Sequence, residues 1–187
     1  MLRHLLAYFI VLKGIVALGQ VVPQAPLVPV SLIDEIGMAM NKAQVMDAAL
    51  QAWSVSFGQQ PGAKQPIHDI ENNVIEGTAR VNFRSKAITF REETMGSITY
   101  TVSIKAVNGQ CNVRVHNFRH TGNRNAPDGG LDLGVICEAD APLVHYEGMG
   151  LGLSRKLHAD ARKAAMDKAQ EVLRAFSARL RLLGGQK

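Results

Sequence analysis

The chain has 187 residues, of which 47% are apolar, 20% charged and 5% aromatic, and its formal net charge is +5. These values fit one globular domain with an apolar core and exclude a largely disordered chain. Two cysteines are too few for a disulfide-rich miniprotein or a four-cysteine zinc module, and the mild basicity does not identify a nucleic-acid-binding protein.

The first 19 residues have the pattern of a secretory signal peptide. A short basic start precedes the apolar run 5–12, and small residues stand at Ala17 and Gly19, the positions that signal peptidase inspects. Lys13 interrupts the run well before the roughly 20 apolar residues that a membrane span needs. We therefore expect cleavage before Gln20 and export to the periplasm or the medium, with an uncleaved N-terminal anchor as the alternative and no membrane span elsewhere.

A proline-rich stretch and an amphipathic helix follow the leader. Residues 20–26 favour an extended linker, because proline disfavours helix, and a first strand is expected near residues 27–36. Asn41 is a suitable N-cap with Gln44 at the capping-box position, and polar and apolar stripes then predict a helix over residues 42–57. The apolar side of this helix carries Met46, Leu50, Trp53 and Phe57.

Alternating polar and apolar residues then predict a run of strands. A short strand is expected over residues 67–70, and a longer one begins at Ile75, whose alternate positions to Phe83 share one face. The clearest element is a hairpin of residues 97–107 and 110–120 around Asn108-Gly109, a dipeptide typical of two-residue hairpin turns.

The turn also predicts the register of this hairpin. With Val107 paired to Gln110, Ala106 faces Cys111, and further along Tyr100 faces Asn117 and Thr99 faces Phe118. The apolar pairs then share one covered face. The opposite, open face receives Arg114, His116, Phe118 and His120, which we take as a candidate surface for binding a ligand or a partner.

The last third of the chain combines a glycine-rich excursion with a long helix. Residues 121–153 show no clear period and are treated as an insertion, with one short element near residues 131–137. Ser154 is expected to cap a final helix that runs to about Leu183. Its apolar stripe consists of Leu157, Ala161, Ala165, Ala169, Val172, Phe176, Leu180 and Leu183.

The order strand, helix, four strands, helix predicts an α+β fold. In a two-layer sandwich of this kind, an antiparallel sheet of about five strands carries both helices on one face, which explains the alternation. We therefore predict that residues 27–187 form one domain.

Three stretches together indicate a family. They are Ala49 with Trp53 and Phe57 in the first helix, the strand VIEGTARV at residues 74–81, and the hairpin of residues 100–118. In this order they resemble domain of unknown function 4468, a family of exported bacterial proteins with a TATA-binding-protein-like (TBP-like) fold. The resemblance implies that fold and export, but it supplies no activity, no catalytic residues and no DNA binding. The glycine-rich loop departs from the family's usual compact link.

The residues that could carry chemistry do not form a compact catalytic motif. The register points Cys111 into the core as a small buried side chain, and a disulfide with Cys137 is the alternative that an oxidising compartment permits. His116 and His120 lie about 13 Å apart along one strand, too far to share a metal ion, so we expect no metal and no cofactor. The glycines of residues 148–152 lack the lysine of a phosphate-binding loop.

Three hypotheses for function remain at this stage. The first is a non-enzymatic module that binds an unknown protein or small ligand through the open sheet face or the glycine-rich loop. The second is a hydrolase-like enzyme whose site gathers His116, His120, His145 and acidic residues. The third, nucleic-acid binding, conflicts with the signal peptide and the modest charge, so no nucleic acid is expected as a partner.

Overall fold

The computed structural model describes residues 27–64, 66–88, 92–126, 129–138, 146 and 148–185. The predicted signal peptide and linker, residues 1–26, lie outside these ranges. The elements in chain order are β1 (Leu32–Gly37), α1 (Lys42–Val55), the 3₁₀ turn η1 (Phe57–Gln59), β2 (Ile67–Asp69), β3 (Val74–Phe83), the 3₁₀ turn η2 (Glu92–Thr94), β4 (Gly96–Val107), β5 (Gln110–Gly122), β6 (Gly134–Val135) and α2 (Leu151–Leu183).

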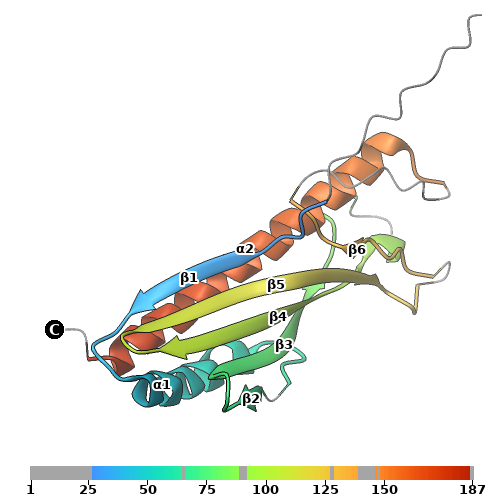
Figure 1. The fold of residues 1–187 in the computed structure, drawn as a ribbon. Coiled ribbons are helices and arrows are strands. Elements are labelled where there is room, and N and C mark those ends of the chain that lie inside the picture. Colours follow the sequence, from blue (N-terminus) through green and yellow to red (C-terminus); the bar gives the residue numbers. More distant parts are fainter. Residues whose placement is uncertain are drawn as a thin grey trace, which may run out of the picture.

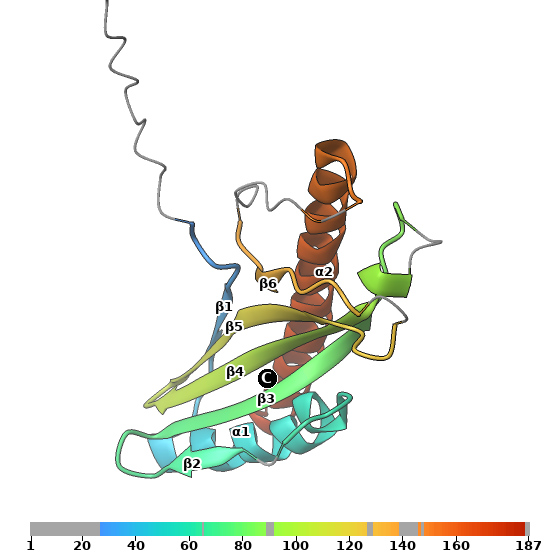
Figure 2. The ribbon, with the colours of Figure 1, turned by 90° about the vertical axis from the view of Figure 1, so that its right-hand side faces the viewer.

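The predicted two-layer α+β architecture is confirmed. The strands form one antiparallel sheet in the order β1-β5-β4-β3-β2, and β6 pairs with the last part of β5. Figures 1 and 2 show the strands side by side, with α1 and the long helix α2 packed against them. The side chains between the helices and the sheet belong to one apolar core. No helix of the described residues covers the other face of the sheet.

The start of α1 follows its sequence signals closely. The Asn41 side chain accepts a hydrogen bond from the Gln44 backbone N–H, and the Gln44 side chain accepts one from the Asn41 N–H, both at 3.0 Å. The side chain of Asn108, at the tip of the β4–β5 hairpin, accepts a hydrogen bond from the Lys42 N–H at 2.8 Å. The capping box therefore forms as predicted, and the hairpin turn helps to anchor the helix.

A glycine on β3 makes room for the largest side chain of α1. Trp53 is 4% exposed, and a Cβ atom placed on Gly77 would lie only 2.3 Å from the Trp53 ring. The ring also packs on Phe57, with centroids 5.3 Å apart, and Phe57 packs on Phe176 of α2 at the same distance. This chain of aromatic contacts joins both helices to the sheet.

Helix α2 begins earlier than the sequence suggested. Gly150 is the N-cap, and Ser154, the predicted cap, is a buried residue of the helix whose N–H donates to the Gly150 carbonyl at 3.1 Å. The Leu153 N–H also donates to the Gly150 carbonyl, at 3.0 Å, so the first turn of the helix precedes Ser154. The predicted apolar stripe is confirmed, because all of its members are buried except Leu183, which is partly buried.

The predicted hairpin register is right near the turn and wrong at the far end. Pairs from Val107/Gln110 to Thr101/His116 form as expected, but beyond them Thr99 lies opposite Arg119 instead of Phe118. The extra residue is Asn117, whose φ of 55° is left-handed, a conformation that asparagine tolerates better than most residues. This β-bulge reverses which side chains point to the helices, so Phe118 and His120 enter the core.

The glycine-rich segment returns to the sheet as a short strand. The Ile136 N–H donates to the Phe118 carbonyl at 2.9 Å, and the Ile136 carbonyl accepts from the Val30 N–H at 2.9 Å. Residues 134–138 therefore lie between the end of β5 and the residues that precede β1. The short element predicted near residues 131–137 is confirmed as β6.

Candidate functional site: the open face of the sheet

We call the side of the sheet opposite α1 and α2 the open face. Alternate residues of β3, β4 and β5 project from it, and the strand pairing places them in rows across the sheet. Most of these side chains are exposed or half-buried, in contrast to the residues between them, which form the core. The bulge at Asn117 divides the open face into two halves with different charge.

The half nearer the hairpin turn, here the turn half, carries charges of both signs. One row runs from Ile33 through Arg114 and Ser103 to Glu76. Glu35 on β1 accepts a hydrogen bond from the Gln110 side chain at 3.0 Å. Two acidic side chains therefore stand on the same half as Arg114.

The half beyond the bulge, here the distal half, is rich in arginine. Arg80 and Arg119 flank Thr99 on the two neighbouring strands, and all three side chains are exposed. The next row consists of Asn82, Ser97 and Thr121. Past the strand ends, Arg84 and Arg124 are also exposed. These rows offer guanidinium, amide and hydroxyl groups for hydrogen bonds.

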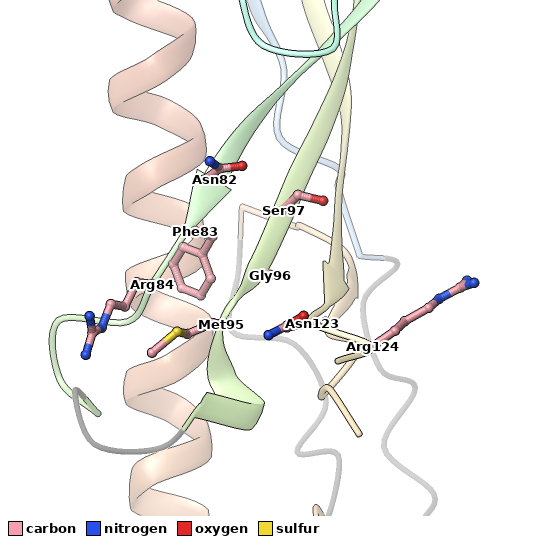
Figure 3. Close-up of a pocket in the computed structure, with 9 residues that line it drawn as sticks. Asn82, Phe83, Arg84, Met95, Gly96, Ser97, Asn123 and Arg124 are labelled. Atoms are coloured by element: carbon pink, nitrogen blue, oxygen red, sulfur yellow. The ribbon is translucent and has the colours of Figure 1, made fainter. Parts of the chain in front are cut away.

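An open cavity of about 460 Å³ lies at the end of the distal half. In Figure 3 the guanidinium groups of Arg84 and Arg124 point to opposite sides, with Met95 and Asn123 between them. The Asn123 N–H donates to the Met95 carbonyl at 2.8 Å, and this hydrogen bond joins the residue that follows β5 to the residue that precedes β4. The residues that line the cavity are Asn82, Phe83, Arg84, Met95, Gly96, Ser97, Gly122, Asn123 and Arg124.

The four residues predicted for the binding surface are divided between the two faces. Arg114 is exposed on the open face, and His116 is half-buried there, with its Nε2 atom 2.9 Å from the Ser103 hydroxyl. The prediction that Phe118 and His120 also face outward is wrong, since they are 0% and 1% exposed on the helix side. The bulge at Asn117 is the physical reason, because one inserted residue exchanges the faces of every residue after it.

His120 is enclosed by the core and the returning loop. Its Nδ1 atom accepts a hydrogen bond from the Leu133 N–H at 3.4 Å, and the Phe83 ring contacts it edge-on with centroids 5.1 Å apart. Its Nε2 atom has no hydrogen-bond partner among the described residues. Burial lowers the pKa of His120 to about 4, although Asp132 opposes this shift. The imidazole is therefore neutral at pH 7 and out of reach of a substrate in solvent.

A second histidine stands near this buried group. The Tyr146 hydroxyl lies 3.2 Å from Nε2 of His158 on α2, and the Asp132 carboxylate accepts a hydrogen bond from the Gly122 N–H. These contacts tie the glycine-rich loop to α2 and β5. His145, which the hydrolase hypothesis used, lies outside the described residues.

Cys111 is a buried core side chain, as the register indicated, and the alternative of a disulfide with Cys137 is wrong, because both thiols are free. Cys111 pairs with Ile36 of β1, whereas Cys137 pairs with Pro29, seven residues earlier on the same edge. That separation is about 20 Å along an extended chain, and a disulfide requires Cα atoms within about 7 Å. Burial raises the pKa of Cys111 to about 12, with a smaller contribution from Asp34, so this thiol is not a reactive nucleophile.

Two further features of the described residues bear on function. No three His, Cys, Asp or Glu side chains there gather closely enough to hold a metal ion. Neither α1 nor α2 combines the length and the apolar composition that a bilayer crossing requires.

Comparison with known proteins identifies the family. The model of the family described as "Domain of unknown function (DUF4468) with TBP-like fold" matches residues 38–121, from just before α1 to the end of β5. This segment is a DUF4468 domain. The resemblance found in the first helix, in the strand that bears Gly77 and in the hairpin is thereby confirmed. No curated protein matches the sequence.

Two solved structures are similar in fold to most of this chain. A DUF4468 family protein from Bacteroides ovatus ATCC 8483 has 16% sequence identity and a TM-score of 0.50, covering 79% of this chain and 86% of its own. A TBP-like protein from Parabacteroides distasonis ATCC 8503 has 11% identity and the same TM-score, covering 79% and 92%. At these identities the similarity establishes the TBP-like fold and leaves the activity open.

Sequence reasoning missed the arginines of the distal half as a group. The alternation along β3 already placed Arg80 with the outward-facing residues, but its neighbours across the sheet depended on the register. Without the bulge, Arg119 would point into the core. Only the strand pairing brings Arg80 and Arg119 together on one face, and Arg84 and Arg124 line the cavity at that end of the sheet.

Proposed function

We propose that this DUF4468 domain is a non-enzymatic binding module that takes a protein segment or a small ligand on the open face of its sheet. One observation carries the proposal: in the described part of the chain, α1 and α2 cover one face of the sheet, and the other face presents rows of hydrogen-bonding side chains that end in a cavity of about 460 Å³. Ligand pockets in proteins commonly have volumes between about 300 and 1,000 Å³.

The rigidity of the platform supports binding at this place. β4 and β5 are 12 and 13 residues long and are paired along nearly their whole length, with β3 paired to β4 over ten positions. Side chains on such a sheet stand about 7 Å apart along a strand and about 5 Å apart across strands. The spacing of these donors is therefore fixed before a ligand binds, which lowers the entropic cost of binding.

The chemistry of the cavity favours binding over catalysis. The described lining residues include no His, Cys, Asp or Glu, so no general base stands beside the Ser97 hydroxyl. Of the two described histidines that the hydrolase hypothesis used, His120 is enclosed in the core, and His116 lies on the turn half beside the Ser103 hydroxyl and does not line the cavity. These observations support a module that holds its ligand without transforming it.

Fragment screening by NMR on the ¹⁵N-labelled full chain tests the proposal. We expect bound fragments to shift the amide signals of Ser97 and Asn123, and we expect the variant Ser97→Trp, which fills the cavity, to lose these shifts. Arg179→Trp adds the same bulk on an exposed position of α2 and should keep them. Fragments that bind only elsewhere, or no fragment binding at all, would contradict the proposal.

We also propose that the chain is exported through removal of residues 1–19. The support is the leader pattern in the sequence, since this segment lies outside the described residues. Mass spectrometry of the protein recovered from its native host tests this directly. A mature chain that starts at Gln20 supports export, and a chain that retains Met1 contradicts it.

A further inference from the structure

We propose that the outer edge of β1 is a second binding site, which takes an extended, acidic peptide segment of another protein as an additional strand of the sheet. This site lies apart from the cavity of the open face, so the inference goes beyond the function proposed above. It follows from the backbone groups of β1 that point away from β5, from a groove between β1 and α2, and from the charge of that groove.

The outer edge of β1 presents a row of backbone groups with which no described strand pairs. β1 is an outer strand of the sheet, and its six residues pair with β5 on one side only. Just after β1, the Met38 N–H donates to the Gly109 carbonyl at 2.8 Å, so the even-numbered residues direct their backbone groups toward β5. Because these directions alternate along a strand, the N–H and C=O groups of Ile33, Glu35 and Gly37 point outward. Such a row matches the backbone of another strand.

A groove of about 390 Å³ lies beside this edge, between β1 and α2. Figure 1 shows β1 at the rim of the sheet with α2 alongside it. A peptide paired with β1 would turn alternate side chains into the groove. The other outer strand, β2, has only three residues, so β1 is the better template. The groove lining includes Ile33 and Asp34 of β1 and Leu173, Arg174, Ser177 and Arg181 of α2.

The charges of the groove define where an acidic peptide fits. Asp34, the one carboxylate among the described lining residues, accepts a hydrogen bond from the Ser177 hydroxyl at 2.6 Å. Arg174 and Arg181 lie about one helical turn to either side of Ser177, and both are exposed. The ion pairs found on the described residues of α2 involve other side chains. Acidic residues on either side of the position opposite Asp34 are therefore attracted to the two arginines.

The side chains on the other face of the peptide meet an apolar residue. Ile33 projects from β1 on the open face and is 63% exposed. A side chain directly across from it on an added strand would lie about 5 Å away, within reach of van der Waals contact. The edge therefore favours a peptide in which apolar residues alternate with acidic or neutral polar ones.

The charges in the middle of β1 favour a different protein over a second copy of this chain. Two antiparallel copies of β1 can pair over most of their length only around Asp34 or Glu35, because their outward backbone groups must face each other. Either arrangement places a carboxylate directly opposite its own copy, which is unfavourable in a sheet. A peptide with a neutral residue at this position avoids that repulsion.

Fluorescence anisotropy on the full chain tests the inference with a labelled synthetic peptide of sequence VEVTVE. We expect saturable binding, and in NMR spectra we expect shifts of the amide signals of Ile33, Glu35 and Gly37. The peptide VKVTVK should bind at least about tenfold more weakly. The double variant Arg174→Gln/Arg181→Gln should also weaken VEVTVE binding about tenfold. The control Arg179→Gln, exposed on α2 but not part of the groove lining, should change it by about twofold at most.

Two N-methylated peptides separate strand addition from simple charge attraction. In one, the valine nitrogens of VEVTVE are methylated, and in the other the remaining backbone nitrogens. The N–H groups of only one set can point toward β1, because they alternate along the peptide. One methylated peptide should therefore lose at least about tenfold in affinity, and the other should bind within about threefold of the parent.

Four results would overturn the inference. They are no binding of VEVTVE, equal binding of VKVTVK, the same effect of both methylation patterns, or a stable dimer in sedimentation that protects the β1 amides. Circular dichroism of each variant verifies the fold. Ser97→Trp, which fills the cavity of the open face, should leave peptide binding unchanged. The two proposals can therefore fail independently of each other.

Discussion

Replacing Gly77 with alanine should destabilise the domain, although alanine normally costs less than glycine inside a strand by about 0.5–1 kcal/mol. The added Cβ would lie 2.3 Å from Cη2 and 2.4 Å from Cζ2 of Trp53, where carbon atoms ordinarily keep about 3.5–4.0 Å. The indole would have to move by about 1 Å. Because Trp53 is 4% exposed and packs on Phe57, this movement disturbs the core and should cost about 1–3 kcal/mol.

Urea unfolding measures the effect, and the intrinsic fluorescence is informative because Trp53 is the only tryptophan. Gly37→Ala is a matched control on β1, since nothing lies within 4 Å of a Cβ at that position, and it should not lower the stability. In a Trp53→Leu background, followed by circular dichroism, Gly77→Ala should lose most of its penalty. A Gly77→Ala variant as stable as the parent, or an unchanged penalty without the indole, would refute the reasoning.

Three other predictions follow from the buried groups and the bulge. The folded-state pKa of His120 is depressed from 6.5 to about 4, so its contribution to stability is complete above pH 6.5 and is lost as the pH falls toward 4, by about 3 kcal/mol. Urea midpoints measured against pH should therefore fall more steeply for the parent than for His120→Leu, and equal slopes would contradict this. At Asn117, whose φ is 55°, substitution by glycine should preserve stability, whereas valine should cost about 1–2 kcal/mol in thermal or urea unfolding; equal effects would argue against the bulge. Finally, Cys111 and Cys137 should react with a thiol reagent as two free thiols after unfolding and remain protected in the native protein, because both are buried. A single disulfide-bonded species by mass spectrometry would contradict this last expectation.

Much of the fold was readable from local patterns. The Asn108-Gly109 turn defined the hairpin, the capping box of Asn41 and Gln44 marked the start of α1, and the apolar stripe of α2 was identified almost completely. Each of these signals depends on residues close together in the sequence. Hydrogen-bonding and steric preferences within a few residues determine them, so a sequence alone suffices.

The candidate site was harder to predict because it depends on the register far from the turn. A strict alternation placed Phe118 and His120 on the open face, and only the bulge at Asn117 corrects this. The bulge buries a large aromatic side chain against Tyr100, with centroids 5.6 Å apart. The contact between Tyr100 and Phe118 joins residues 18 positions apart in the chain, so no local sequence pattern predicts it.

The amino-acid sequence by itself determined the elements of this chain, their order and the side of each helix that is buried, because periodicity and turn chemistry act over short stretches of chain. The tertiary structure alone decided which arginines share the distal half, why Gly77 must remain small, and that Cys111 and Cys137 stay apart. These properties depend on how strands far apart in the sequence pair and on which side chains compete for the same space. The strand pairing and the side-chain packing are defined only when the sheet and both helices pack together.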